Sequence, residues 1–275
     1  MTGPLALGSR IHNALEASYK RGEDLLEAHE ALVDNDKALM LAQWGESVDF
    51  TGIEKEAELG RVMLEGFIEW AAEEGIDSGY DIVSAEETLA MPLLDGRVEL
   101  RGKIDIRVRR KADGMLLFRD WKTSANFNDF LDTAHMSEQI MTYMTLEAYH
   151  NPDPATRARG GVFVLIRKVK RGPTSKPPYY MEAEVRHNDF TMRSFWKRLH
   201  GEVTLIMATK DALDAGADHK QVAYPHFTGD CKWKCPFVNF CPMFDDGSAV
   251  EDALATEFHV GDPNERYASP SVPPV

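Results

Sequence analysis

The stretch that decides the fold is Arg101-Gly-Lys-Ile-Asp105, and the related stretch Asp120-Trp-Lys-Thr123 begins fifteen residues after Asp105. Apolar and β-branched side chains dominate the residues around both stretches. The segment Lys111-Ala-Asp-Gly114 between them has the residue types of a tight turn. This pattern predicts a single β-hairpin over residues 98–121.

The length of the turn sets the register of this hairpin, and the sequence allows two lengths. A four-residue loop at 111–114 places Asp105 opposite Asp120, whereas a two-residue loop at 113–114 places it opposite Lys122. Because side chains alternate with period two, Asp105, Asp120 and Lys122 share one face in either register. Two carboxylates and an ammonium group in one place are costly unless a divalent cation lies between them.

An acid-rich hairpin has a plainer explanation, which is a sheet face turned to solvent. The side chains next to the acids are apolar in both strands: Ile104, Ile106, Leu117 and Phe118. A lone carboxylate among such neighbours would be costly. The hairpin is therefore expected to carry a metal site of the kind that hydrolyses phosphodiester bonds.

Length and composition set the class of protein. The chain has 275 residues, of which 43% are hydrophobic and 28% charged, so one sizeable core with a small appended module is expected. No run approaches the roughly 18 apolar residues of a membrane span. The N-terminus lacks a basic-then-apolar signal pattern. These features predict a cytoplasmic protein without membrane contact.

The formal net charge of −14 argues against a protein that coats nucleic acid by bulk electrostatics, but it allows a local basic channel. Basic residues cluster at 107–111 and again at 167–171. Each cluster fits a solvated strand end as well as one wall of a DNA groove, and the sequence leaves both interpretations open.

Hydrophobic periodicity predicts the remaining elements. Helices are expected over residues 7–19, 23–42, 54–74, 136–150 and 189–215, the last with a stripe of Phe195, Leu199, Val203 and Ile206. Strands are expected over 82–87, 89–94, 161–167 and 179–185 besides the hairpin, and residues 126–130 are expected to form a loop. The order predicts an α/β fold with a mixed central sheet flanked by helices and the hairpin acids at its centre. The expected domains are a core over 1–222, a cysteine module over 223–247 and a partly disordered acidic, proline-rich tail over 248–275.

Four motifs occur in order along the chain: Leu7-Gly-Ser-Arg-Ile-His12, Gly102-Lys-Ile-Asp105, Asp120-Trp-Lys-Thr123 and Gln139-x-x-x-Tyr143. Together they resemble the RecB-type branch of the PD-(D/E)xK nucleases, over nearly the whole chain. Three later segments resemble phage-encoded RecB-like exonucleases with a C-terminal iron–sulfur cysteine module: Tyr224-Pro, residues 230–237 and Arg266-Tyr. The resemblance implies a restriction-endonuclease-like core and a metal-dependent nuclease.

The chemistry of phosphodiester hydrolysis assigns roles to the hairpin residues. It requires charge neutralisation and a deprotonated water, both of which Mg²⁺ or Mn²⁺ supplies. Asp105 and Asp120 are the expected ligands, together with the backbone carbonyl of Trp121. Lys122 is expected to polarise the attacking water or to stabilise the developing charge.

By the resemblance, His12 is a further metal ligand, and one imidazole would favour Mn²⁺. The alternative is a histidine on a helix face that hydrogen-bonds Glu16 one turn later.

The resemblance also implies that Gln139 and Tyr143 orient Lys122 or the DNA backbone. Their alternative is the polar edge of an amphipathic helix. Glu86 or Glu87 could approach the site, but neither is counted among its residues.

The cysteines follow the pattern Cys231-x3-Cys235-x5-Cys241. Three thiolates do not complete a tetrahedral zinc site or a 4Fe–4S cluster, each of which takes four ligands. In the resembling family a fourth cysteine precedes the Leu-Gly-Ser-x-x-His motif, and it is absent from this sequence. Either the given start is a truncation, or the cluster is lost, incomplete or replaced. His226 could complete a Zn²⁺ site, and the third interpretation is three free cysteines within a small aromatic module.

The sequence thus predicts a metal-dependent DNA exonuclease in end processing or recombination, in a host cytoplasm if it is phage-encoded. Its expected partners are DNA and a recombination protein or a second copy of the chain. One alternative is a catalytically idle member of the same fold that binds DNA or a partner nuclease. The other is a zinc-binding protein without nuclease activity.

Overall fold

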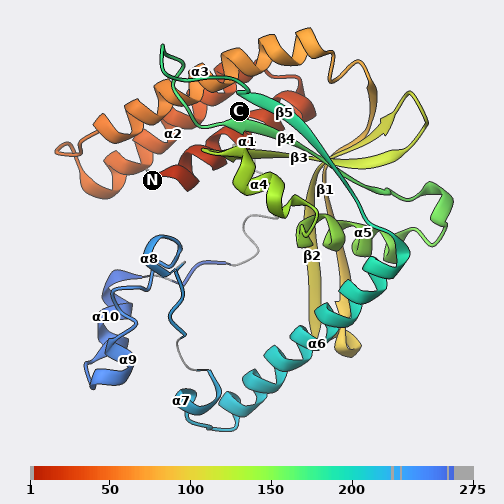
Figure 1. Ribbon diagram of the computed structural model, residues 1–275. Coiled ribbons are helices and arrows are strands. Elements are labelled where there is room, and N and C mark those ends of the chain that lie inside the picture. Colours follow the sequence, from red (N-terminus) through yellow and green to blue (C-terminus); the bar gives the residue numbers. More distant parts are fainter. Residues whose placement is uncertain (1–2, 224–225, 230, 259, 263–275) are drawn as a thin grey trace, which may run out of the picture. The chain divides into compact units, whose positions relative to one another are not determined.

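The computed structural model describes residues 3–223, 226–229, 231–258 and 260–262 (Figure 1). The chain divides into two compact units, residues 1–197 and 198–275, and the boundary falls inside helix α6 (Asp189–Asp214). The domain boundaries expected at 222 and 247 stay predictions. Tyr224-Pro, Asp230 and the segment 263–275 with Arg266-Tyr lie outside the described residues.

A five-stranded sheet in the order β1-β2-β3-β4-β5 forms the centre of the first unit. Its strands are β1 (Tyr80–Leu93), β2 (Val98–Arg110), β3 (Leu116–Ser124), β4 (Gly160–Arg167) and β5 (Tyr180–Arg186). Only β3 and β4 pair in parallel, because two helices connect them, and the other neighbours are antiparallel. The expected α/β fold with a mixed central sheet is confirmed, and β3 is its middle strand.

The turn between β2 and β3 settles the register of the hairpin. Arg110 donates its backbone N–H to the Met115 carbonyl, and Gly114 donates to the Arg110 carbonyl. The turn is therefore the four-residue loop 111–114, and Gly114 takes the left-handed conformation that ends it (φ 71°). The ladder runs to Ile106 opposite Arg119, so its register places Asp105 opposite Asp120.

Three helices cover one face of the sheet: α1 (Pro4–Arg21), α2 (Leu25–Trp44) and α3 (Thr51–Glu74). They enclose a core that includes Ile11 and Leu64 from the helices and Val108, Leu117 and Val164 from the strands. Local signals set the helix ends. The Asp24 carboxylate accepts the first free N–H groups of α2, and Pro4 opens α1, which therefore begins before the residue expected.

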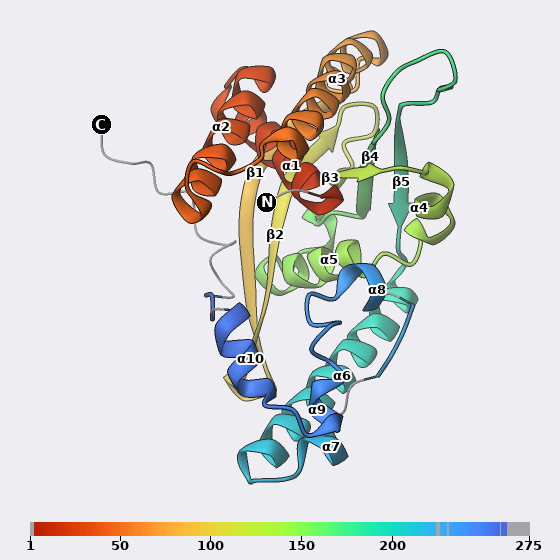
Figure 2. The same ribbon diagram turned by 90° about the vertical axis from the view of Figure 1, so that its left-hand side faces the viewer.

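Helix α5 (Glu138–His150) covers the opposite face with α4 (Phe127–Ala134), as Figures 1 and 2 show. The expectation of a loop at 126–130 is wrong. The Asn126 side chain accepts the Asn128 N–H as an N-cap, and the buried Phe127 anchors the first turn to the core.

Strand β1 is continuous, whereas the sequence predicts two strands separated at residue 88. Its pairing shifts register between Ile82 and Ser84, and Glu86 has φ 52°. Such a positive φ is rare outside glycine and indicates a locally constrained backbone.

The second unit holds the rest of α6 and four short helices: α7 (His219–Val222), α8 (Cys231–Lys234), α9 (Met243–Asp246) and α10 (Val250–Glu257). Phe258 contacts the rings of Phe237 and Phe240. The apolar stripe expected along α6 is buried at Phe195, but Ile206 near its end is 65% exposed. Within the described residues, no helix combines the length and apolar character that a membrane crossing needs.

Candidate functional site

The two hairpin acids lie where β2 and β3 separate. Beyond the pair of Ile106 and Arg119, Asp105 uses its side chain to accept the backbone N–H of Trp121 at 3.3 Å. Asp105 and Asp120 are 4% and 1% exposed, and both project from the same face as Lys122 because the strand period is two. The predicted juxtaposition of these three residues is present.

Asp120 is held from two sides. Lys122 Nζ lies 2.6 Å from Asp120 Oδ2, and Gln139 on α5 donates its amide to Asp120 Oδ1 at 2.6 Å. Burial and the nearby charge of Asp105 raise the pKa of Asp120, against the opposing effect of Lys122. Burial is the largest of these effects, so a cation at the site would stabilise the ionised form of Asp120.

Helix α1 brings His12 to the other acid. His12 Nε2 lies 2.7 Å from Asp105 Oδ2, and Glu16 instead pairs with Lys103 at 3.0 Å. The alternative of a local His12–Glu16 hydrogen bond is therefore wrong. Burial alone lowers the pKa of His12, but the hydrogen bond and charge of Asp105, with the charge of Asp120, outweigh it and raise the pKa.

Gln139 and Tyr143 act as one hydrogen-bonded unit beneath the site. The Gln139 amide also donates to the Tyr143 hydroxyl at 2.7 Å, and that hydroxyl donates to the Lys103 carbonyl at 2.6 Å. Gly102 permits the close packing of α5 on β2, because a Cβ there would lie 2.7 Å from Leu146 Cδ1 and 3.2 Å from the Tyr143 ring. The structure thus places Gln139 against Asp120, whereas the resemblance implied a contact to Lys122 or DNA.

Glu86 is a neighbour of the site that lies outside the four sequence motifs. The pairs on either side of it, Ala85 with Ile106 and Glu87 with Ile104, place it opposite Asp105 on β1. Burial raises the pKa of Glu86 to about 7, although Lys103 Nζ lies only 2.7 Å from its carboxylate. The sequence does contain a signal for Glu86. The period of two along a strand places Glu86 opposite Asp105 once β1 is paired with β2.

A cavity of about 350 Å³ opens beside these residues, between α1 and the end of β3. His12, Lys122 and Lys168 line it, as does Gly8, whose missing side chain leaves room beside Thr123. A substrate group can therefore approach the imidazole and the ammonium from solvent.

The donor set suits a hard divalent cation. Two carboxylates and one imidazole nitrogen are ligand types of Mg²⁺ and Mn²⁺. In the part of the chain that is described, no three His, Cys, Asp or Glu side chains already converge as a metal site. His12 instead forms an ion pair with Asp105, and Lys122 forms one with Asp120.

The three cysteines of the second unit are each partly buried, and none of them forms a disulfide bond within the described part of the chain. The Thr228 backbone N–H approaches Cys231 Sγ at 3.3 Å. Among the described residues, Cys231, Cys235, Cys241 and His226 form no group arranged to hold a metal.

The basic cluster at 107–111 is paired internally. Arg107 contacts Glu87 and Glu147, and Arg110 contacts Asp113 and Glu184. This pairing favours the interpretation of a charged strand end over a DNA groove at that cluster.

A mixed sheet in which the adjacent strands β2 and β3 carry a buried acid pair and a lysine is typical of the restriction-endonuclease-like fold. The family model for the PD-(D/E)XK nuclease superfamily matches residues 2–242, and the chain belongs to that superfamily. Its members are nucleases that usually use divalent metals such as Mg²⁺ or Mn²⁺.

Two further comparisons add little. The chain matches no curated protein. A solved structure described as "Crystal structure of SSO0001" is 17% identical, with 69% of this chain and 77% of that chain covered and a TM-score of 0.33.

Proposed function

We propose that this protein is a metal-dependent DNA exonuclease that processes DNA ends, and that Asp105, Asp120 and Lys122 are its catalytic centre. The observation that carries the proposal is the burial of both acids on adjacent strands with the lysine 2.6 Å from Asp120. Two buried carboxylates side by side do not help the core to pack. A bound cation and a phosphate would together use both carboxylates and the Lys122 ammonium group.

Asp105, Asp120 and His12 would hold Mg²⁺ or Mn²⁺, with the Trp121 backbone carbonyl as a further ligand. The bound ion would supply charge neutralisation at the phosphate and a water of lowered pKa. Lys122, released from Asp120, would donate a hydrogen bond to the attacking water or to the phosphate oxygen on which charge develops. Gln139 would keep Asp120 in one orientation through the hydrogen bond it donates.

The exonuclease mode, the RecB-type branch and a role in recombination rest on the order of the four motifs. A phage origin rests on the later segments at Tyr224-Pro, 230–237 and Arg266-Tyr. The DNA substrate, the cytoplasmic location and a recombination partner or second copy belong to the same proposal. A catalytically idle member of the fold would keep the same acids but leave DNA intact.

The test is a cleavage assay on end-labelled linear DNA, single-stranded and double-stranded, with Mg²⁺, with Mn²⁺ and with EDTA. Mononucleotide or short products from linear DNA, with closed circles of the same sequence intact, are the expected result. Cleavage of the closed circles would show that the protein is an endonuclease and not an exonuclease. Intact DNA in every lane would favour the idle alternative.

A metal at the cysteine module is a separate part of the proposal. Iron, sulfide and zinc are measured per chain after anaerobic purification. Iron with matching sulfide would support an iron–sulfur cluster, one zinc without iron would support a site completed by His226, and neither would leave three free cysteines.

A further inference from the structure

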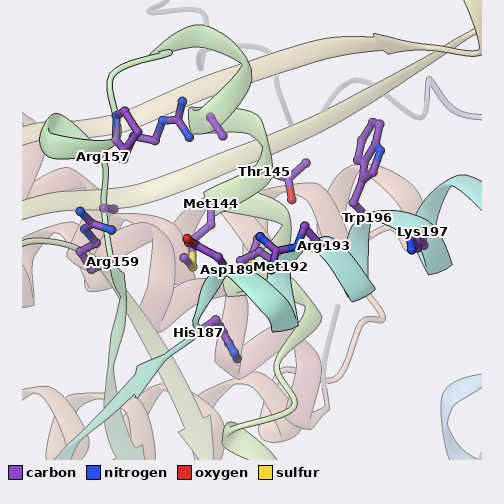
Figure 3. Close-up of a pocket in the computed structure, with 13 residues that line it drawn as sticks. Met144, Thr145, Arg157, Arg159, His187, Asp189, Met192, Arg193, Trp196 and Lys197 are labelled. Carbon is purple, nitrogen blue, oxygen red and sulfur yellow. The ribbon is translucent and has the colours of Figure 1, made fainter.

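A basic pocket of the first unit lies away from the acid centre. It is a cavity of about 480 Å³ between α5, the segment before β4 and the start of α6. Figure 3 shows its labelled side chains and the segments that supply them. Four cationic side chains line it, Arg157, Arg159, Arg193 and Lys197, against one carboxylate, Asp189.

These cations differ from the two best-paired arginines of the cluster at 107–111. The protein has 45 acidic and 31 basic residues, and Arg107 and Arg110 pair with acids. Arg159, Arg193 and Lys197, by contrast, have no side-chain hydrogen bond or ion pair with any residue that the structure describes. Like charges left together in an acidic protein are costly unless an anion joins them.

The remaining walls are apolar and aromatic. Met144 and Ala148 of α5 face Met192 and Trp196 of α6 across the cavity, and the Trp196 side chain is 37% exposed. Arg193, Trp196 and Lys197 share one face of α6, because they are three or four residues apart. A flat ring on Trp196 and an anion on the cations would both be bound at this face.

From this combination we infer that the pocket is a nucleotide-binding site, with the phosphate on Arg193 and Lys197, one helical turn apart on α6, and the base against Trp196. The inference goes beyond the proposed nuclease centre and rests on it only for the source of the nucleotide. That source is either a free mononucleotide, which is the product of an exonuclease, or one nucleotide of the bound strand.

Helix α5 separates the pocket from the acid centre. Gln139 contacts Asp120 near the start of α5, and Ala148 lines the pocket near its end. Nine residues of helix span about 14 Å, which is about four steps of a B-form DNA strand. The separation allows the two sites to be tested independently.

The experiment is calorimetric titration with dAMP, and with a single-stranded oligonucleotide in EDTA so that no cleavage occurs. Four proteins are compared: wild type, Arg193→Glu, Asp120→Asn and Lys55→Glu. Lys55 is an exposed lysine of α3, so its reversal matches the charge change of Arg193→Glu outside the pocket. Quenching of tryptophan fluorescence, measured in wild type and in Trp196→Phe, gives a second signal from the pocket.

We expect Arg193→Glu to weaken binding of dAMP or of the oligonucleotide at least about tenfold, while Lys55→Glu binds as wild type does. Loss of dAMP binding would identify the free nucleotide as the ligand. Loss of oligonucleotide binding alone would identify the strand.

Equal binding by wild type and Arg193→Glu, or binding lost only in Asp120→Asn, would overturn the pocket assignment. Failure of the proposed nuclease would instead appear as absent cleavage, with the effect of Arg193→Glu on binding unchanged.

Discussion

His12 and Asp105 are 93 residues apart in the chain, yet His12 Nε2 lies 2.7 Å from Asp105 Oδ2. This contact joins the first helix to the central sheet at the point where β2 and β3 separate. It also leaves Asp105 with two partners, the imidazole and the Trp121 N–H. The first helix is therefore part of the candidate site.

Replacement of Asp120 by asparagine is expected to reduce metal-dependent cleavage by about a hundredfold or more. The reason is that the metal ion would lose one of its anionic ligands. The melting temperature should stay within about 3 °C of wild type, because the change removes a like charge beside Asp105. End-labelled cleavage and thermal unfolding measure the two effects. Asp132→Asn, an exposed acid of α4, is the matched control and should keep full activity. Wild-type cleavage by Asp120→Asn would refute the assigned centre.

His12→Ala is expected to raise the Mn²⁺ concentration needed for half-maximal activity by about tenfold or more, with partial recovery of rate at high Mn²⁺. The reason is the loss of one nitrogen ligand, while both carboxylates remain. A metal titration of the rate is the measurement, and His135→Ala, which changes an exposed histidine, should titrate as wild type does. An unchanged metal dependence in His12→Ala would make His12 a structural partner of Asp105 only.

Gln139 and Tyr143 should behave as a coupled pair. Tyr143→Phe removes the hydroxyl between the Gln139 amide and the Lys103 carbonyl, so it should lower the free energy of unfolding by about 1 kcal/mol. Gln139→Leu should lower the cleavage rate, because Asp120 loses its orienting donor.

In a double-mutant cycle of Gln139→Leu and Tyr143→Phe, the effects on the free energy of unfolding should be non-additive by about 0.5 kcal/mol or more. Tyr149→Phe, which removes an exposed hydroxyl on the same helix, should cost less than about 0.5 kcal/mol. Additive effects would show that the two side chains act separately.

The buried histidine of α2 predicts a pH dependence of stability. Burial, with the charge of Arg10, lowers the pKa of His29 to about 4, and its Nε2 faces Gly60 of α3. The unfolded chain, with a His pKa of about 6.5, binds the proton more readily, so stability falls as pH drops from about 6.5 towards 4. The loss should be up to about 1 kcal/mol for each pH unit.

Urea unfolding of wild type and His29→Gln at pH 7 and pH 5 measures the contribution of His29 to the pH dependence of stability. The variant should lose less stability between the two pH values, because glutamine does not titrate. An equal loss in both proteins would assign the acid sensitivity to other groups.

The sequence by itself determined the features that depend on local periodicity. Alternation along β2 and β3 fixes Asp105, Asp120 and Lys122 on one face in either hairpin register. The apolar runs of the sheet and of α3 and α5 are equally local signals. Where a local signal was missed, as in the Asn126 cap of α4, the error stayed within one element.

Only the tertiary structure decided which side chains complete the site. The choice of His12 between Glu16 and Asp105 depends on how α1 packs against the sheet. The contact of Gln139 with Asp120 depends on the close approach of α5 that Gly102 permits, and the position of Glu86 depends on how β1 pairs with β2. The basic pocket likewise forms only where α5 meets α6. These contacts join residues far apart in the chain, and their geometry follows from packing, which no local pattern of the sequence encodes.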